Sequence, residues 1–200
     1  MLSTFRRLSP ATGALRLVAL LSLVTLAATA ACDDPFEPRA TTSVRTDSFV
    51  VWALTGTPVN LPTAMNVVFF TPVRVEPTYG FHLAFDIDAQ GRVELIPVTR
   101  VGGIITAGRR VGIQKATVPF EQLARAPAIG YHYDSVFVMT PGETAVVELA
   151  AEQCPFGVSQ IVYAKLVFRT VDPVRRQLSF RMTYDPNCGF RSFLPGVPTN

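Results

Sequence analysis

Histidine and the motifs of common hydrolases are scarce in this chain of 200 residues. His82 and His132 are the only histidines, so a serine-hydrolase triad or a three-histidine zinc site has almost no material. Neither G-x-S-x-G nor H-E-x-x-H occurs. The sequence therefore predicts a protein that is not an enzyme and that carries no metal or cofactor.

A surplus of positive charge is missing as well once the N-terminus is set apart. The chain has a formal net charge of +3, but Arg6, Arg7 and Arg16 precede position 32 and all 15 acidic residues follow it. Subtracting these three arginines from the 18 basic residues leaves 15 basic against 15 acidic residues. This zero balance removes the usual argument for a nucleic-acid partner or an anionic lipid surface.

One long apolar run is present near the N-terminus, with the sequence LVALLSLVTLAATAAC from Leu17 to Cys32. A basic start, an apolar core and small residues at a cleavage site define an export signal, and all three occur here in that order. The core is too short and too close to the N-terminus for a spanning helix, so an uncleaved anchor is the weaker interpretation.

Ala30, Ala31 and Cys32 make this N-terminus resemble that of bacterial lipoproteins, over about the first 33 residues. The resemblance implies removal of residues 1–31, acylation of Cys32 and attachment to a membrane face outside the cytoplasm, toward the periplasm or the cell exterior. Thr29 departs from the pattern, because an aliphatic residue usually stands there. The alternative is a secreted protein without lipid, cleaved after residues 28–30. The sequence leaves open which membrane is involved.

Setting Cys32 aside leaves Cys154 and Cys188, an even pair in an oxidising compartment. We therefore expect a Cys154–Cys188 disulfide. A two-cysteine metal site is a poor alternative, because structural zinc needs four ligands and neither cysteine has a Cys-x-x-Cys partner.

The remaining chain fits one domain. Residues 32–46 are rich in Pro, Thr and charge, which predicts a flexible tether, and the folded domain is expected over residues 47–200. Within it, short runs of β-branched and aromatic residues alternate with turn residues, as is typical of strands. Two hairpins are expected, over 81–98 and 161–184, and single strands are expected at 49–54, 67–75, 110–116, 135–140 and 145–150.

Residues 119–126 form the one segment with a helical pattern, with proline in its first turn. Eight or nine strands with a single short helix predict an all-β fold, an antiparallel β-sandwich that includes the immunoglobulin-like form, with a small β-barrel as the alternative. A parallel α/β core is disfavoured because its crossover helices are missing.

Asp86, Asp88 and Gly91 form a D-x-D-x-x-G pattern that is typical of some calcium loops. The further acidic ligands of such a loop are missing, so we interpret the pattern as a hairpin turn. His82 is expected to face solvent from the polar side of its strand. The Arg109-Arg110 and Arg175-Arg176 pairs are expected to face solvent at strand ends.

Tyr131, His132 and Tyr133 form an aromatic cluster that suits a sugar-binding site, although such a cluster more often folds onto the core. The leading hypothesis is a non-catalytic envelope protein that binds another protein or supports an assembly. The second is a module that binds a glycan or a small apolar ligand. The third is a hydrolase that uses carboxylates such as Glu94, Glu121 or Glu143.

Overall fold

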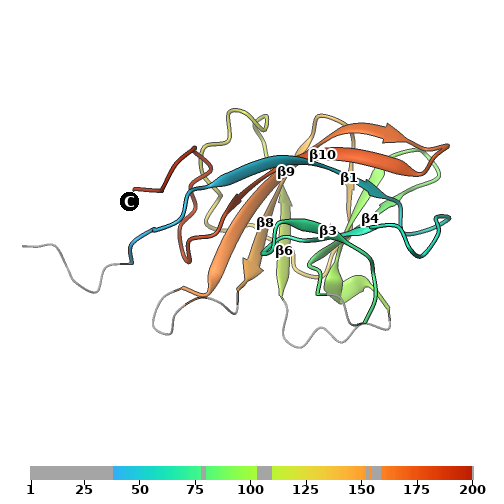
Figure 1. The fold of residues 1–200 in the computed structure, drawn as a ribbon. Coiled ribbons are helices and arrows are strands. Elements are labelled where there is room, and N and C mark those ends of the chain that lie inside the picture. The colour runs from blue at the N-terminus through green and yellow to red at the C-terminus, as the bar shows by residue number, and fades with distance from the viewer. Residues whose placement is uncertain (1–37, 78–79, 103–109, 152–153, 155–158, 200) are drawn as a thin grey trace, which may run out of the picture. The chain divides into compact units, whose positions relative to one another are not determined.

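The computed structural model describes residues 38–77, 80–102, 110–151, 154 and 159–199. In these residues the chain forms two antiparallel sheets of five strands each (Figure 1). Sheet I contains, in spatial order, β1 (Arg45–Trp52), β10 (Gln177–Asp185), β9 (Ile161–Asp172), β8 (Thr144–Ala150) and β6 (Val111–Lys115). Sheet II contains β3 (Thr71–Val73), β2 (Ala64–Asn66), β4 (Leu83–Ile87), β5 (Val93–Pro97) and β7 (Phe137–Met139).

Aromatic side chains join the two sheets into a sandwich. The Phe85 ring of sheet II lies 5.0 Å from the Phe180 ring and 6.0 Å from the Phe168 ring of sheet I, measured between centroids. Inward positions alternate along β10, where Leu178, Phe180, Met182 and Tyr184 are buried as expected. The sheets do not close on each other as a barrel, so the β-sandwich is confirmed and the barrel alternative is wrong.

Both expected hairpins are present. β4 pairs with β5 across the turn at Asp88–Gly91, and β9 pairs with β10 across the turn that follows Asp172. Gly91 has φ of +77°, a conformation that glycine adopts without steric cost. The turn residues between the alternating segments therefore predicted the positions of these two hairpins correctly.

The helix expected over residues 119–126 is not formed. Pro119 O accepts hydrogen bonds from the N–H groups of Gln122 and Leu123, which makes a single turn. The backbone beyond it pairs with the C-terminal segment instead, through Phe193 N–H to Ala124 O and Ala126 N–H to Arg191 O, each at 2.8 Å. The described residues contain one short 3₁₀ turn, η1 (Val98–Arg100), and no helix that is long and apolar enough to cross a membrane.

The single strand expected over residues 67–75 is also wrong. Residues 67–70 form a tight turn between β2 and β3, with Phe70 N–H donating to Val67 O at 3.2 Å. Phe70 has φ of +56°, which is uncommon outside glycine, and its buried ring packs against Phe49 and Tyr184. Tertiary packing of Phe70 thus overrides the strand preference of this apolar run.

The chain enters the domain through contacts with its own C-terminal part. The N–H groups of Thr41 and Thr42 donate to Asn187 Oδ1 at 2.9 and 3.0 Å, and Val44 pairs with Gly196. The domain start expected at Asp47 therefore lies inside β1, and ordered contacts reach back to Thr41.

Candidate functional site

The outer face of sheet I is covered by an irregular segment, residues 116–135, which we call the cover segment. Its backbone pairs with β6 between His132 and Ile113 and with the C-terminal segment between Arg125 and Ser192. A second, smaller apolar cluster lies beneath it, built on Ala126, Val146, Tyr163 and Phe193. This explains why seven consecutive residues of β9 are buried on both faces. The expected aromatic site lies in this cover segment.

Tyr131 points onto the sheet. Its ring lies 6.2 Å from that of Tyr163, and its hydroxyl donates to Pro127 O at 3.0 Å. Burial raises the pKa of Tyr131, and burial together with the nearby Glu148 carboxylate raises the pKa of Tyr163 to about 12. Both hydroxyls therefore stay protonated at neutral pH and act as hydrogen-bond donors.

Tyr133 donates a short hydrogen bond to Glu148 Oε1 on β8, and this bond raises the pKa of the tyrosine. The guanidinium of Arg110 lies 3.7 Å from the centre of the Tyr133 ring. A Cβ atom at Gly112 would come within 2.8 Å of both Tyr131 Cβ and Tyr133 Cε1, so glycine is required beneath these rings. The faces of the Tyr131 and Tyr133 rings, against which a sugar would stack, are therefore covered by Arg110 and by sheet I.

His132 lies between the two tyrosines but differs from them in exposure. Its side chain is exposed, while its backbone N–H and C=O pair with Ile113 of β6 at 2.9 and 3.0 Å. The three residues expected as a ligand site therefore lie together, and their described contacts fasten the cover segment to sheet I.

Lys165 also holds the cover segment, although no pattern in the sequence singled it out. It lies on the outer face of β9, is buried, and donates from Nζ to Phe120 O at 2.6 Å and Leu123 O at 2.9 Å. The ammonium also lies over the rings of Phe120 and Phe193. Burial lowers the pKa of Lys165, while the nearby Glu121 carboxylate acts in the opposite direction. The two carbonyl acceptors and two aromatic rings compensate for its lost hydration.

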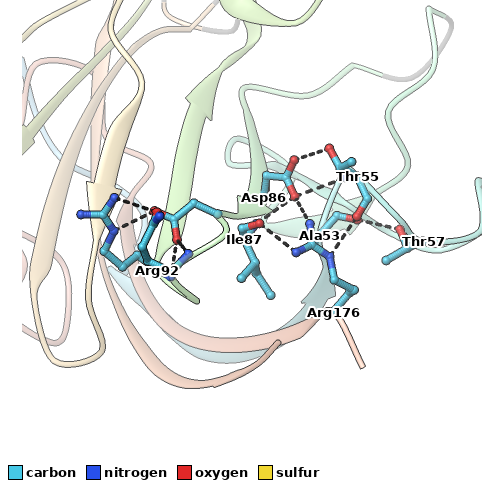
Figure 2. Close-up of polar contacts among 9 residues, drawn as sticks. Ala53, Thr55, Thr57, Asp86, Ile87, Arg92 and Arg176 are labelled. Atoms are coloured by element: carbon cyan, nitrogen blue, oxygen red, sulfur yellow. Dashed lines mark hydrogen bonds and ion pairs between the residues drawn. The ribbon is translucent and has the colours of Figure 1, made fainter. Parts of the chain in front are cut away.

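Asp86 and Arg176 form a half-buried ion pair at the end of the sandwich where β4 and β9 finish (Figure 2). Arg176 donates to Asp86 Oδ1 at 2.6 Å, to Ile87 O at 2.8 Å and to Thr55 O at 3.0 Å. Thr55 in turn donates to the Asp86 carboxylate from its hydroxyl and its N–H. We call this group, with loop 53–62 and turn 173–176, the Arg176 end. The expectation that Arg175 and Arg176 both face solvent is wrong for Arg176.

The D-x-D-x-x-G pattern builds the turn. Asp88 accepts hydrogen bonds from the N–H groups of Gln90 and Arg92 and pairs with the Arg92 side chain at 2.7 Å. Asp86 is engaged by Arg176, so the two carboxylates serve different partners (Figure 2). In the described part of the chain no group of three or more His, Cys, Asp or Glu residues is placed to hold a metal ion.

His82 is buried, which corrects the expectation that it faces solvent. Its Nδ1 accepts a hydrogen bond from the N–H of Val67 at 3.1 Å, so it helps to hold the turn between β2 and β3. The polar member of an alternating strand is buried here because residues 81–87 are covered on both faces.

The three carboxylates considered for a hydrolase, those of Glu94, Glu121 and Glu143, lie in separate places and contact different residues. Glu143 pairs with Lys115, and its backbone hydrogen bond from Thr140 is the main cause of its lowered pKa. Glu121 pairs with Arg169 and Arg181 on the outer side of sheet I. Glu94 lies on β5 of sheet II opposite Val138. No described contact joins any two of them.

Cys154 and Cys188 form the expected disulfide, with Cα atoms 5.7 Å apart. It joins the connection after β8 to the segment after β10. Beside it, Asp185 is fully buried, and Asn187 donates to its Oδ1 from both N–H and Nδ2. Burial raises the pKa of Asp185 against the lowering effect of these bonds. Cys32 and the export signal lie outside the described residues, as does Arg109.

Comparison of the chain with protein-family models, with curated proteins and with solved structures finds no match.

Proposed function

We propose that this protein is an exported lipoprotein, anchored to a membrane by acyl chains on Cys32, whose β-sandwich binds another envelope protein and catalyses no reaction. The observation that carries the proposal is the Arg176 end. Val59 and Val174 are 90% and 91% exposed there, on two segments that Arg176 ties together. Loops that a rigid scaffold holds in place commonly carry the binding residues of a protein.

The disulfide supports the export half of the proposal. Structural disulfides persist in oxidising compartments outside the cytoplasm and are rare inside it. Cys154 and Cys188 are bonded although 34 positions separate them in the sequence.

The roles of the buried ionisable groups support the non-catalytic half. Asp86, Glu148, Lys165 and Asp185 each contact groups that hold a turn, a loop or the cover segment in place. The tyrosines beside Glu148 have raised pKa values, so they are not poised as bases at neutral pH.

Anchoring is tested by expressing the full chain and its Cys32→Ala variant in a bacterium that acylates lipoproteins. We expect the wild-type N-terminal peptide to start at Cys32 with attached acyl chains by mass spectrometry, and the variant to lack them. A wild-type chain cleaved after residues 28–30 and released in soluble form would contradict the proposal.

Partner binding is tested by placing a photo-crosslinking amino acid at Val59 or Val174 in the full chain in its native host. One defined crosslinked protein is expected from both positions. The control is the same amino acid at Glu143, a partly exposed residue of the β7–β8 connection. Equal products from all three positions, or no product from the two valine positions, would contradict binding at the Arg176 end.

A further inference from the structure

The opposite end of the domain, where the chain enters, also presents exposed apolar side chains. Phe69 is 75% exposed and is the one aromatic residue among the exposed large hydrophobic residues of the described chain. Val197 is exposed beside Gly196, which pairs with Val44. We call Phe69 and Val197 the entry face.

The turn that carries Phe69 is held rigidly. Asn66 Oδ1 accepts the Phe69 N–H at 2.9 Å, while Asn66 Nδ2 donates to Gly80 O at 2.8 Å. His82 Nδ1 accepts the Val67 N–H, so most of the turn is fastened by side chains from its neighbours. Phe70, the residue after Phe69, keeps a left-handed conformation. Sparsely populated backbone conformations of this kind cluster at functional sites.

Phe69 lies close to the point where the tether meets the domain. The Arg45 guanidinium, at the start of β1, lies 4.9 Å from the centre of the Phe70 ring. Thr41 is bound to Asn187, and nine positions separate it from Cys32. A fully extended chain of that length spans at most about 30 Å. A lipid on Cys32 would therefore keep the entry face near the membrane that holds the anchor.

We propose that the entry face contacts that same lipid surface, with the Phe69 side chain inserted at the boundary of headgroups and acyl chains. This inference rests on the lipid anchor of the proposed function. Because residues 32–200 together carry as many acidic as basic residues, we take the contact to be apolar and independent of anionic lipid. The Arg176 end then faces away from the bilayer, because β10, nine residues long, separates the two ends by roughly 27 Å.

The test uses the acylated full chain in phosphatidylcholine vesicles with and without bromine on the acyl chains, which quenches nearby tryptophan. Phe69→Trp is compared with Val174→Trp, an apolar position at the Arg176 end that is 91% exposed, against 75% for Phe69. Wild-type protein supplies the background from Trp52. We expect the added tryptophan of Phe69→Trp to lose roughly half of its fluorescence in brominated vesicles, as for a side chain at the acyl boundary. The added tryptophan of Val174→Trp should lose none.

The outcomes separate the inference from the proposed function. Acylated protein that floats with the vesicles but shows no quenching of Phe69→Trp overturns the inference and leaves the anchor intact. Equal quenching of both variants also overturns it, because the domain would then have no preferred orientation. A chain that carries no acyl group and does not float overturns the anchor and the inference together.

Discussion

The guanidinium of Arg176 cannot be replaced by another cation, because its three nitrogens each reach a different acceptor. These acceptors are Asp86 Oδ1, Ile87 O and Thr55 O, on two segments of the chain. Lysine keeps the charge but not the planar fork that serves three acceptors at once. One side chain thereby fixes the loop and the turn that present Val59 and Val174.

Arg176→Lys is expected to lower the free energy of unfolding by about 1–3 kcal/mol, because it leaves half-buried acceptors without donors. Urea unfolding followed by tryptophan fluorescence measures this change. The matched control is Arg175→Lys, where the native side chain is 79% exposed and its ion pair with Asp172 is long, at 3.9 Å. Equal destabilisation by both substitutions would contradict the role given to Arg176.

Lys165 on β9 holds the cover segment as Arg176 holds the Arg176 end. Lys165→Ala removes the donor to Phe120 O and Leu123 O and the packing of its stem, so the expected loss of unfolding free energy is about 1–3 kcal/mol. Trypsin cleavage after Arg125 should become faster, because the segment is released locally. Lys115→Ala is the control, since Lys115 makes only a surface pair with Glu143. Unchanged cleavage in Lys165→Ala would show that the apolar cluster alone holds the segment.

At the scale of elements, strands with a clear two-residue period were predicted well. The hairpins β4–β5 and β9–β10 follow from alternating apolar residues on either side of turns that each begin with an aspartate, and the β10 face follows from its period alone. The disulfide followed from there being an even pair of cysteines.

The failures have a common physical cause. Residues 119–126 have a helical pattern, but their carbonyls are taken by Lys165 and the 191–193 segment. Residues 67–75 have a strand-like composition, but Phe70 gains more from packing on Phe49 and Tyr184 than from an extended backbone. In both cases the deciding partner lies far away in the sequence, and a local pattern contains no information about it.

At the candidate site too, local patterns were recognised and contacts between distant residues were not. Tyr131 and Tyr133 were recognised as a cluster because they are neighbours in the sequence. Their partners Glu148, Tyr163 and Arg110 were missed, since these lie elsewhere in the sequence. Arg176 and Lys165 likewise acquire their roles only through the fold.

The free edge of β1 is another element-scale feature. Trp52 N–H on this edge donates to Pro62 O, and Val44 N–H donates to Gly196 O. Between them, the Ser48 N–H is taken by the side chain of its neighbour Asp47 at 2.7 Å. A charged side chain that occupies an edge donor protects a sheet from pairing with a second chain.

Asp47→Ala is therefore expected to increase self-association, because it frees an edge N–H and removes a charge. Sedimentation velocity over a concentration series measures this. Asp134→Ala makes the same charge change at an exposed position of the cover segment and should leave the protein unchanged. Identical sedimentation of both variants and the wild type would mean that Asp47 does not protect the edge.

At the scale of the whole molecule, stability at alkaline pH reflects the packing on the outer face of sheet I. The pKa of Tyr163 is raised from 10.0 to about 12, so the folded state keeps a proton that the unfolded chain releases. The folding free energy from this group is complete below pH 10 and is lost as the pH rises toward 12. Tyr131 acts in the same direction.

Lys165 acts in the opposite direction, because its lowered pKa makes the folded state release a proton first, which adds stability up to its ordinary value of 10.5. Between neutral pH and pH 10 we therefore expect no loss of the free energy of unfolding, and above pH 10 we expect a steep loss, measured by urea unfolding at a series of pH values. Tyr163→Phe should make the fall in unfolding free energy above pH 10 less steep. Lys165→Met should remove any rise in unfolding free energy that precedes this fall. A loss that begins well below pH 10 in the wild type would contradict these assignments.

The hydrogen bonds between Asn187 and residues 41–42, where the chain enters the domain, have a mechanical consequence. Tension on the N-terminal segment reaches Thr41 and Thr42, whose backbone is bound to the Asn187 side chain. From Asn187 the covalent path leads through the adjacent Cys188 to Cys154, beyond the end of β8. In the anchored protein proposed above, a pull from the membrane would thus be shared between β1 and the disulfide-linked segment after β8. The domain is loaded as a unit, and β1 is shielded from being peeled off its edge.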